Sequence, residues 1–341
     1  MKILDMIIAV LAIIIPLVFG YFIDYAQLGV VAGLAGLMLS QDHFRTSLKE
    51  QFDQSFSTAL ASGIAFIAGL RLTGHFYLSL FAIPVIIFTI TTLGRFSRKW
   101  MRASVLFSIF LVIGYGSGST GKIAFVTAVT FILGIIWVQL LLLIMHPVYM
   151  GYLKRKKVLW KEEPKRSISN KQLWLHWKKG LKSLKGWQFQ LRLTLCIVIA
   201  QIIRYFISEH HTYWILLTIT IVIQYNLEHS TERIVGRSMG TLIGVCISMI
   251  LAFLKGPAEL YFSILVFLTI LRSFFSKKNY FLYSLASTPL IMALLGFGKP
   301  MTDAIFTDRI FTTCLGCIIS FIFGYYIWKK YILKPSAEVK K

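Results

Sequence analysis

Apolar runs of about 15 to 25 residues recur along the whole chain, separated mostly by short polar turns. A helix rises 1.5 Å per residue, so a run of this length can cross the roughly 30 Å hydrocarbon core of a bilayer. Of the 341 residues, 57% are hydrophobic and only 15% are charged, too few to cover the surface of a water-soluble protein of this size. The sequence therefore predicts an all-α integral membrane protein.

We expect about twelve transmembrane helices, half of them on each side of a polar central segment. They are predicted near residues 4–23, 27–40, 56–72, 76–93, 101–117, 122–147, 190–208, 212–226, 236–254, 258–275, 279–297 and 304–328. The predicted organisation is a first six-helix repeat over 1–147, a basic linker over 148–189, a second six-helix repeat over 190–334 and a cytoplasmic tail over 335–341.

The division into two halves follows from an internal duplication, in which similar residues recur roughly 183 positions apart. The matching pairs include Tyr21 with Tyr205, Gln41 with Gln224, Thr58 with Thr241, and Gly134 with Gly316. Since each unit holds an even number of spans, both copies have the same orientation. Parallel repeats are related by a pseudo-twofold axis along the membrane normal, and a transport path commonly lies where they meet.

The net charge of +22 would suit a nucleic-acid partner or an anionic membrane surface, and its distribution decides between them. Twelve of the 36 Lys and Arg residues fall between Lys154 and Lys185, and most of the others lie in short turns. This is the positive-inside pattern. It predicts a membrane protein with both termini in the cytoplasm, and it gives no support for nucleic-acid binding.

Within the linker, Leu and Trp recur at helical spacing from Lys171 to Lys185, and lysines occupy other positions. This pattern predicts an interfacial helix with tryptophans at headgroup level and lysines toward anionic lipid, so that residues 154–185 contact anionic headgroups. Two interpretations stay open, an anchor that fixes topology and a regulatory site for lipid or a partner.

Small residues four positions apart mark surfaces where helices approach closely. Gly236, Gly240 and Gly244 form such a stripe in the second half. In lipid, where no hydrophobic force draws helices together, a smooth stripe allows backbone contact. We expect it to pack the bundle, without any need for a substrate.

Polar residues beside these runs have two interpretations each. Gln41 and Gln224 each end an apolar run, where an amide could cap free carbonyls or face a pathway. Arg233 and Arg237, one turn apart, could bind a carboxylate bidentately, or could serve only membrane topology. Arg309 lies one turn into its run and could likewise be functional or form a structural pair with Asp308.

The run from Tyr213 to Val245 resembles the signature of the fusaric acid resistance and aromatic acid exporter superfamily of bacterial membrane proteins. The residues that carry the resemblance are Tyr213, Trp214, Gln224, Arg233, Arg237, Gly240, Thr241 and Gly244. The resemblance implies export or permeation of organic anions, such as aromatic carboxylic acids. The candidate substrate-binding residues are Gln41, Tyr213, Trp214, Gln224, Arg233, Arg237, Thr241 and Arg309.

A proton-driven exporter needs a group that loads and releases a proton. The candidates are Asp24, Glu209, His210 and Asp308, although solvated loops explain most of them. Because buried carboxylates are scarce, a passive organic-anion channel is an alternative. A third possibility is a non-transporting scaffold of an envelope pathway that uses the basic linker as a docking surface.

Catalysis, metals and cofactors find little support in the sequence. Cys314 and Cys317 have metal-ligand spacing, but no second Cys or His cluster accompanies them. We expect both to be small packing residues. The predicted external loops are short and hold no paired carboxylates or His–acid cluster, so we expect no enzyme and no cofactor.

Overall fold

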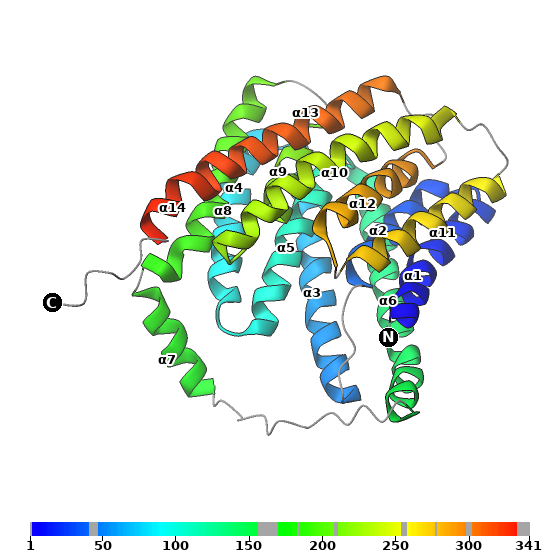
Figure 1. Cartoon of the computed structure of the whole chain (residues 1–341), viewed down its shortest axis with the longest axis horizontal. Coiled ribbons are helices and arrows are strands. Elements are labelled where there is room, and N and C mark those ends of the chain that lie inside the picture. The colour runs from blue at the N-terminus through cyan, green and yellow to red at the C-terminus, as the bar shows by residue number, and fades with distance from the viewer. Residues whose placement is uncertain are drawn as a thin grey trace.

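The computed structural model describes residues 2–40, 47–155, 170–182, 184–207, 211–253, 258–276, 278–297 and 302–332. Within these ranges the chain is helical and contains no strand (Figure 1). The helices, in chain order, are α1 (Lys2–Phe22), α2 (Ala26–Leu39), α3 (Leu48–Leu72), α4 (Phe76–Gly94), α5 (Arg98–Gly116), α6 (Gly121–Arg155), α7 (Asn170–Leu181), α8 (Leu184–Phe206), α9 (Tyr213–Val222), α10 (Leu227–Phe253), α11 (Ala258–Phe275), α12 (Tyr280–Leu295), α13 (Asp303–Ile319), the π-helix η1 (Ser320–Tyr326) and α14 (Ile327–Ile332). The all-α prediction is confirmed.

Every predicted span coincides with a helix, the last one with α13, η1 and α14 together. In the described ranges, eight helical segments are long and apolar enough to cross a membrane: α1, α3, α4, α6, α8, α10, α11 and the run from α13 into α14. Four shorter apolar helices accompany them, namely α2, α5, α9 and α12. The chain is thus a multi-pass membrane protein, while the number of twelve spans stays a prediction.

Several predicted boundaries are wrong. Helices α3 and α10 begin at Leu48 and Leu227, well before the expected starts at 56 and 236, because their polar first turns continue the helix beyond the apolar run. Helix α9 ends at Val222, not at 226: Ile223 turns to an extended conformation with ψ of 120°. An apolar run shows the part of a helix that matches lipid and not where the backbone leaves the helix.

The four shorter helices occupy equivalent places in the chain. Helices α2 and α5 are second and fifth in the first half, and α9 and α12 are second and fifth in the second half. The ten residues of α9 rise only about 15 Å, half the hydrocarbon thickness. Most of its side chains are buried, so this short helix lies inside the bundle.

Equivalent helices also pack in equivalent ways. Helix α3 lies against α5 as α10 lies against α12, and α2 lies against α6 as α9 lies against α13. Between the halves, α1 packs on α11 and α4 packs on α8, so that in both contacts a first helix meets a fourth. In Figure 1, α10, α12 and α13 run obliquely across the steeper α3 and α5.

The predicted glycine stripe of α10 is a packing surface. A Cβ atom at Gly240 would lie 2.7 Å from the Cβ of Ser284, and one at Gly244 would lie 2.7 Å from the Cβ of Thr288. Both neighbours are on α12, so the stripe brings α10 and α12 to near backbone contact.

Helix α7 forms where the linker was expected to form an interfacial helix. Its Trp177 donates a hydrogen bond from Nε1 to the carbonyl of Thr92, 3.0 Å away, while Trp174 and Leu175 are exposed. In Figure 1, α7 lies at the edge of the bundle. Residues 156–169 of the predicted linker lie outside the described residues.

Candidate anion-binding site

A cavity of about 400 Å³ lies between the two halves. Helices α2 and α5 of the first half form one side, and α8 to α12 of the second half, with the α9–α10 turn, form the other. Leu, Met, Val, Ile and Phe side chains make up its apolar lining. The polar lining residues are Arg102, Gln224, Tyr225, Arg233, Arg237, Arg272, Ser276, Tyr280, Tyr283 and Ser287. The cavity is therefore an apolar chamber with its polar groups concentrated on a few helices.

The charged groups of this lining are all cationic. Four arginines contact the cavity, and its described lining holds no Asp, Glu or His. Two of the four, Arg237 and Arg272, have exposed fractions of only 2% and 1%. Guanidinium groups gathered in a low-dielectric wall produce a positive potential that attracts anions.

Arg233 and Arg237 project into the cavity from successive turns of α10. The Arg233 guanidinium lies 4.9 Å from the centre of the Tyr280 ring, and its Nη1 donates to the carbonyl of Ile221 at 3.3 Å. This contact places a cation at the C-terminal end of α9, where the helix dipole favours it. Arg237 differs, since its Nε and Nη2 have no hydrogen-bond partner among the described residues. Arg237 is thus the side chain whose donors are available to a ligand.

Arg272 of α11 completes the basic wall on the side of α12. Its Nη2 donates to the Tyr283 hydroxyl at 2.9 Å, and the guanidinium lies 5.1 Å from the centre of the same ring. The phenol holds the guanidinium in place beside the cavity.

Arg102 and Arg272 are not among the substrate-binding residues predicted from the sequence, although both line the cavity. A signal was present for Arg272, because Ser273 to Ser276 separate it from Lys277. It therefore lies about one turn inside its apolar run, where an arginine is a functional candidate. For Arg102, within a basic turn, the sequence offers no comparable signal.

Gln224 both caps α9 and lines the cavity. Its Nε2 donates to the carbonyls of Ile221 at 3.0 Å and Ile223 at 3.2 Å. Its backbone N–H donates to Ser230 Oγ at 3.0 Å. The two interpretations of this glutamine are therefore compatible in the structure.

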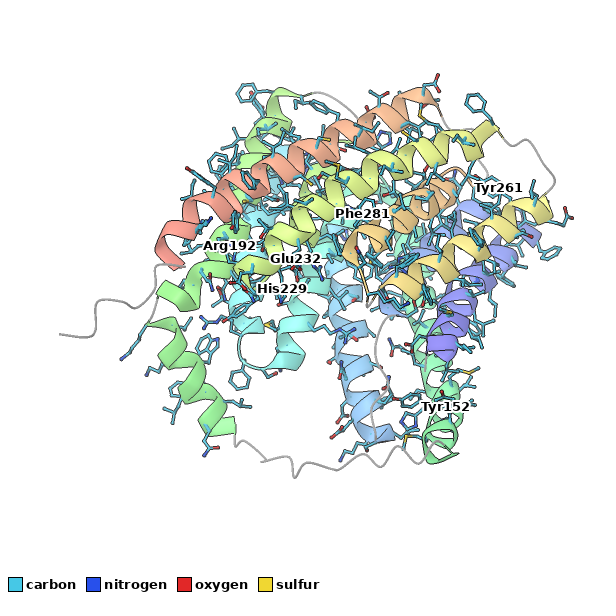
Figure 2. The ribbon with its side chains drawn as sticks, in the orientation of Figure 1. Tyr152, Arg192, His229, Glu232, Tyr261 and Phe281 are labelled. Atoms are coloured by element: carbon cyan, nitrogen blue, oxygen red, sulfur yellow. The ribbon has the colours of Figure 1, made fainter. Side chains whose placement is uncertain are left out.

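A buried arginine fixes the turn that carries Gln224. Arg192 of α8 is fully buried, and its Nη2 donates to Ser230 Oγ at 2.9 Å. Its Nε donates to the carbonyl of Gly324 in η1 at 2.5 Å. Figure 2 labels Arg192 near the α10 residues His229 and Glu232. The guanidinium thus ties the α9–α10 turn to the π-helix, an irregularity that often marks functional segments.

A second group of predicted residues lies at the opposite end of α9. The Arg309 guanidinium of α13 is 4.7 Å from the centre of the Trp214 ring. Asp308 Oδ2 is 2.9 Å from Nδ1 of His211, whose ring stacks on Trp214 at 4.8 Å. Asp308 therefore pairs with His211. The alternative interpretation of Asp308 and Arg309 as a structural pair is wrong. Tyr213 packs against Gly116, at the same end.

Of the remaining predicted residues, the described ones, Thr241 and Asp24, do not line the cavity. Thr241 is buried at the α10–α12 contact, where Thr288 donates to its hydroxyl at 3.5 Å. Asp24 is exposed in the turn between α1 and α2, with φ of 61°. Gln41, Glu209 and His210 lie outside the described residues. Across the described part of the chain, no group of three His, Cys, Asp or Glu residues is arranged to hold a metal ion.

The second half also matches a known family. Residues 195–323 fit the family model described as fusaric acid resistance protein-like. This half of the chain is fusaric acid resistance protein-like. The match runs from α8 into η1 and includes Arg237, Arg272 and Arg309, whereas Arg102 lies outside it. The resemblance inferred from the sequence is confirmed.

Curated relatives match about the same share of the chain. An uncharacterized protein of Haemophilus influenzae is 30% identical over 141 residues, which is 40% of this chain and 19% of that protein. Inner membrane protein YccS of Escherichia coli is 29% identical over 141 residues, with the same two shares. Uncharacterized protein YhfK of the same organism is 24% identical over 150 residues, 43% of this chain and 21% of its own length. The matches thus span about one fifth of these relatives' length. No solved structure matches the chain significantly.

Proposed function

We propose that the chain moves organic anions outward across the bacterial inner membrane and binds them in the arginine-lined cavity. One observation carries the proposal: four arginines, two of them almost completely buried, line one cavity whose described walls contain no acidic side chain. A charge in hydrocarbon costs about 3 kcal/mol or more unless it is paired or faces water. A bound anion would supply a counter-charge to Arg237, whose Nε and Nη2 have no hydrogen-bond partner among the described residues.

The shape and chemistry of the cavity favour a small aromatic carboxylate. Its volume of about 400 Å³ falls within the range of roughly 300 to 1,000 Å³ that is usual for small-molecule sites. The free donors of Arg237 suit a carboxylate, which arginine binds bidentately. Tyr280, Tyr283 and Phe189 offer ring faces and edges to the body of such a substrate.

The same proposal includes two parallel repeats with the cavity at their boundary. The equivalent positions of the short helices and the reciprocal α1–α11 and α4–α8 contacts support it. With the linker and both termini in the cytoplasm, as the basic turns indicate, Arg233 near the start of α10 lies on the cytoplasmic side. The cavity then loads from the cytoplasm, as export requires.

A passive organic-anion channel is the second candidate. The observation that favours it is the lack of a titratable carboxylate or histidine in the described lining. Of the predicted coupling residues, Asp308 is half-buried and paired with His211, and that pair is the described candidate for proton coupling. A proton-driven exporter would need the Asp308–His211 pair to load and release the proton.

Flux of benzoate into proteoliposomes containing the full chain tests both candidates. We expect benzoate flux from the unaltered chain, a loss of most of it in Arg237→Gln, and unchanged flux in Arg71→Gln, which removes an exposed arginine elsewhere. An imposed pH gradient at constant voltage accelerates a proton-coupled exporter and leaves a passive channel unaffected. Equal flux of benzoate and related carboxylates in protein-free and protein-containing vesicles would remove the proposal.

A further inference from the structure

Arg309 of α13 is a buried cation with no acidic hydrogen-bond partner among the described residues. Its exposed fraction is 1%, and none of its Nε, Nη1 and Nη2 atoms has a hydrogen-bond partner in the described part of the chain. The carboxylate of the neighbouring Asp308 pairs with His211, with Oδ2 lying 2.9 Å from Nδ1. The Arg309 guanidinium lies over the face of the Trp214 ring, 4.7 Å from its centre.

The electrostatics of α9 make this placement more unusual. Trp214 is the second residue of α9, so Arg309 lies at the N-terminal end of this helix, where the dipole and the free N–H groups are positive. A helix N-terminus favours an anion and disfavours a cation. The two ends of α9 therefore differ: Arg233 bonds to a carbonyl at the C-terminal end, whereas Arg309 meets a like partial charge.

Two buried threonines on α13 and α9 have side-chain hydroxyl groups without a hydrogen-bond partner in the described ranges. Thr313 is one turn along α13 from Arg309, and Thr218 is one turn along α9 from Trp214. Both are buried, and neither Oγ1 has a hydrogen-bond partner in the described ranges. Gly316, on the same side of α13 as Arg309, brings this helix against Thr218, since a Cβ atom there would lie 2.9 Å from the Cβ of Thr218.

Thr218, Thr313 and Arg309 lie outside the lining of the cavity, on helices that pack against α10, which carries Arg237 of that lining. Arg237 lies about 15 Å along α10 from its first residue, and Arg309 about 9 Å along α13 from its first residue. Helices α9, α10 and α13 all pack against one another. Buried polar atoms in native proteins nearly always have partners, so four buried side chains with unpartnered atoms on these three helices, within the described ranges, indicate a ligand path.

We propose that Arg309, at the N-terminus of α9, is a second anion station, and that the anion passes from Arg237 to it along Thr218 and Thr313. The inference rests on the proposed function and deepens it. It places the outer part of the route inside the second half, between α9, α10 and α13, and not along the boundary between the halves. The occupant is a carboxylate anion that supplies a counter-charge to Arg309.

Cysteine modification in the membrane tests the path without knowledge of the natural substrate. The full chain, with Cys196, Cys246, Cys314 and Cys317 replaced by alanine, receives Thr218→Cys or Thr313→Cys. The probes are an anionic and a cationic methanethiosulfonate of similar size. Matched controls are Thr220→Cys and Thr312→Cys, because these threonines are equally buried on the same helices but their hydroxyls donate to backbone carbonyls.

We expect the anionic reagent to modify positions 218 and 313 about tenfold or more faster than the cationic reagent, as a cationic path requires. Positions 220 and 312 should react slowly with both. Equal rates at all four positions, or no reaction at 218 and 313, would overturn the inference. If benzoate flux is absent while this pattern of modification is present, the proposed substrate is wrong and the path stands.

Charge substitution at Arg309 provides a second test on the Thr313→Cys chain. Arg309→Gln should abolish the preference for the anionic reagent, and Arg309→Lys should keep it. A residue that only stabilises the fold would not change this preference. The inference is refuted if Arg309→Gln retains full selectivity, provided that gel filtration shows the variant to be monodisperse.

Discussion

Replacing Arg237 by methionine should make the ligand-free protein more stable and its anion site weaker. The guanidinium is 2% exposed, and two of its nitrogens have no hydrogen-bond partner among the described residues. Leaving a buried donor unsatisfied costs about 1 to 3 kcal/mol, whereas methionine fills a similar space with a flexible apolar chain. We therefore expect Arg237→Met to raise the free energy of unfolding by about 2 kcal/mol.

The anion should reduce this difference, because it stabilises the unaltered chain more than it stabilises Arg237→Met. A ligand present at about 100 times its dissociation constant adds about 2.7 kcal/mol to the stability of the unaltered chain. Loss of charge-assisted hydrogen bonds worth about 1.5 to 3 kcal/mol weakens the affinity of Arg237→Met by roughly 10- to 150-fold. The same concentration then adds only about 0.3 to 1.4 kcal/mol to the variant.

Thermal unfolding of the purified protein, followed by the fluorescence of its 8 tryptophans, measures both effects. At about 2 °C per kcal/mol for a large domain, we expect the midpoint of Arg237→Met to rise by about 4 °C without benzoate. Benzoate should raise the midpoint of the unaltered chain by about 5 °C and that of the variant by about 3 °C or less. The control Arg71→Met removes an exposed arginine and should change neither value. A lower midpoint for Arg237→Met, or full protection of it by benzoate, would refute the reasoning.

Three further predictions follow from individual contacts. Gly240→Ala should destabilise the fold by about 1 to 3 kcal/mol, because its Cβ would lie 2.7 Å from that of Ser284. The helical control is Gly151→Ala, whose Cβ would have no atom within 4 Å. Equal thermal midpoints of the two variants would contradict the prediction. Asp308→Asn should abolish any dependence of benzoate flux on a proton gradient while Asp24→Asn leaves it intact, because Asp308 is 2.9 Å from His211 and Asp24 is exposed. We also propose that the linker helix binds anionic headgroups. A peptide of residues 170–185 should prefer phosphatidylglycerol to phosphatidylcholine vesicles by about 1 kcal/mol per lysine. Equal partitioning into the two kinds of vesicle, measured by tryptophan fluorescence, would exclude this role.

The sequence by itself determined the helices and their packing surfaces. Apolar run length fixed the membrane class and the place of every described helix, because spanning hydrocarbon is a requirement on consecutive residues. The spacing of Gly236, Gly240 and Gly244 along one helix face likewise predicted the close contact that α10 makes with α12. These properties need no knowledge of distant residues.

Only the tertiary structure decided which charged residues act together. Every arginine near a cytoplasmic turn satisfies the positive-inside rule equally well, so charge distribution alone could not show that Arg237 and Arg272 lie buried beside one cavity. The sequence also suggested a pair between the adjacent residues Asp308 and Arg309. In the fold, Asp308 instead lies 2.9 Å from His211, and the Arg309 guanidinium lies over the ring of Trp214. The physical reason is that a charged side chain interacts with whatever helix packs against it, and that helix is often about a hundred residues away in the chain.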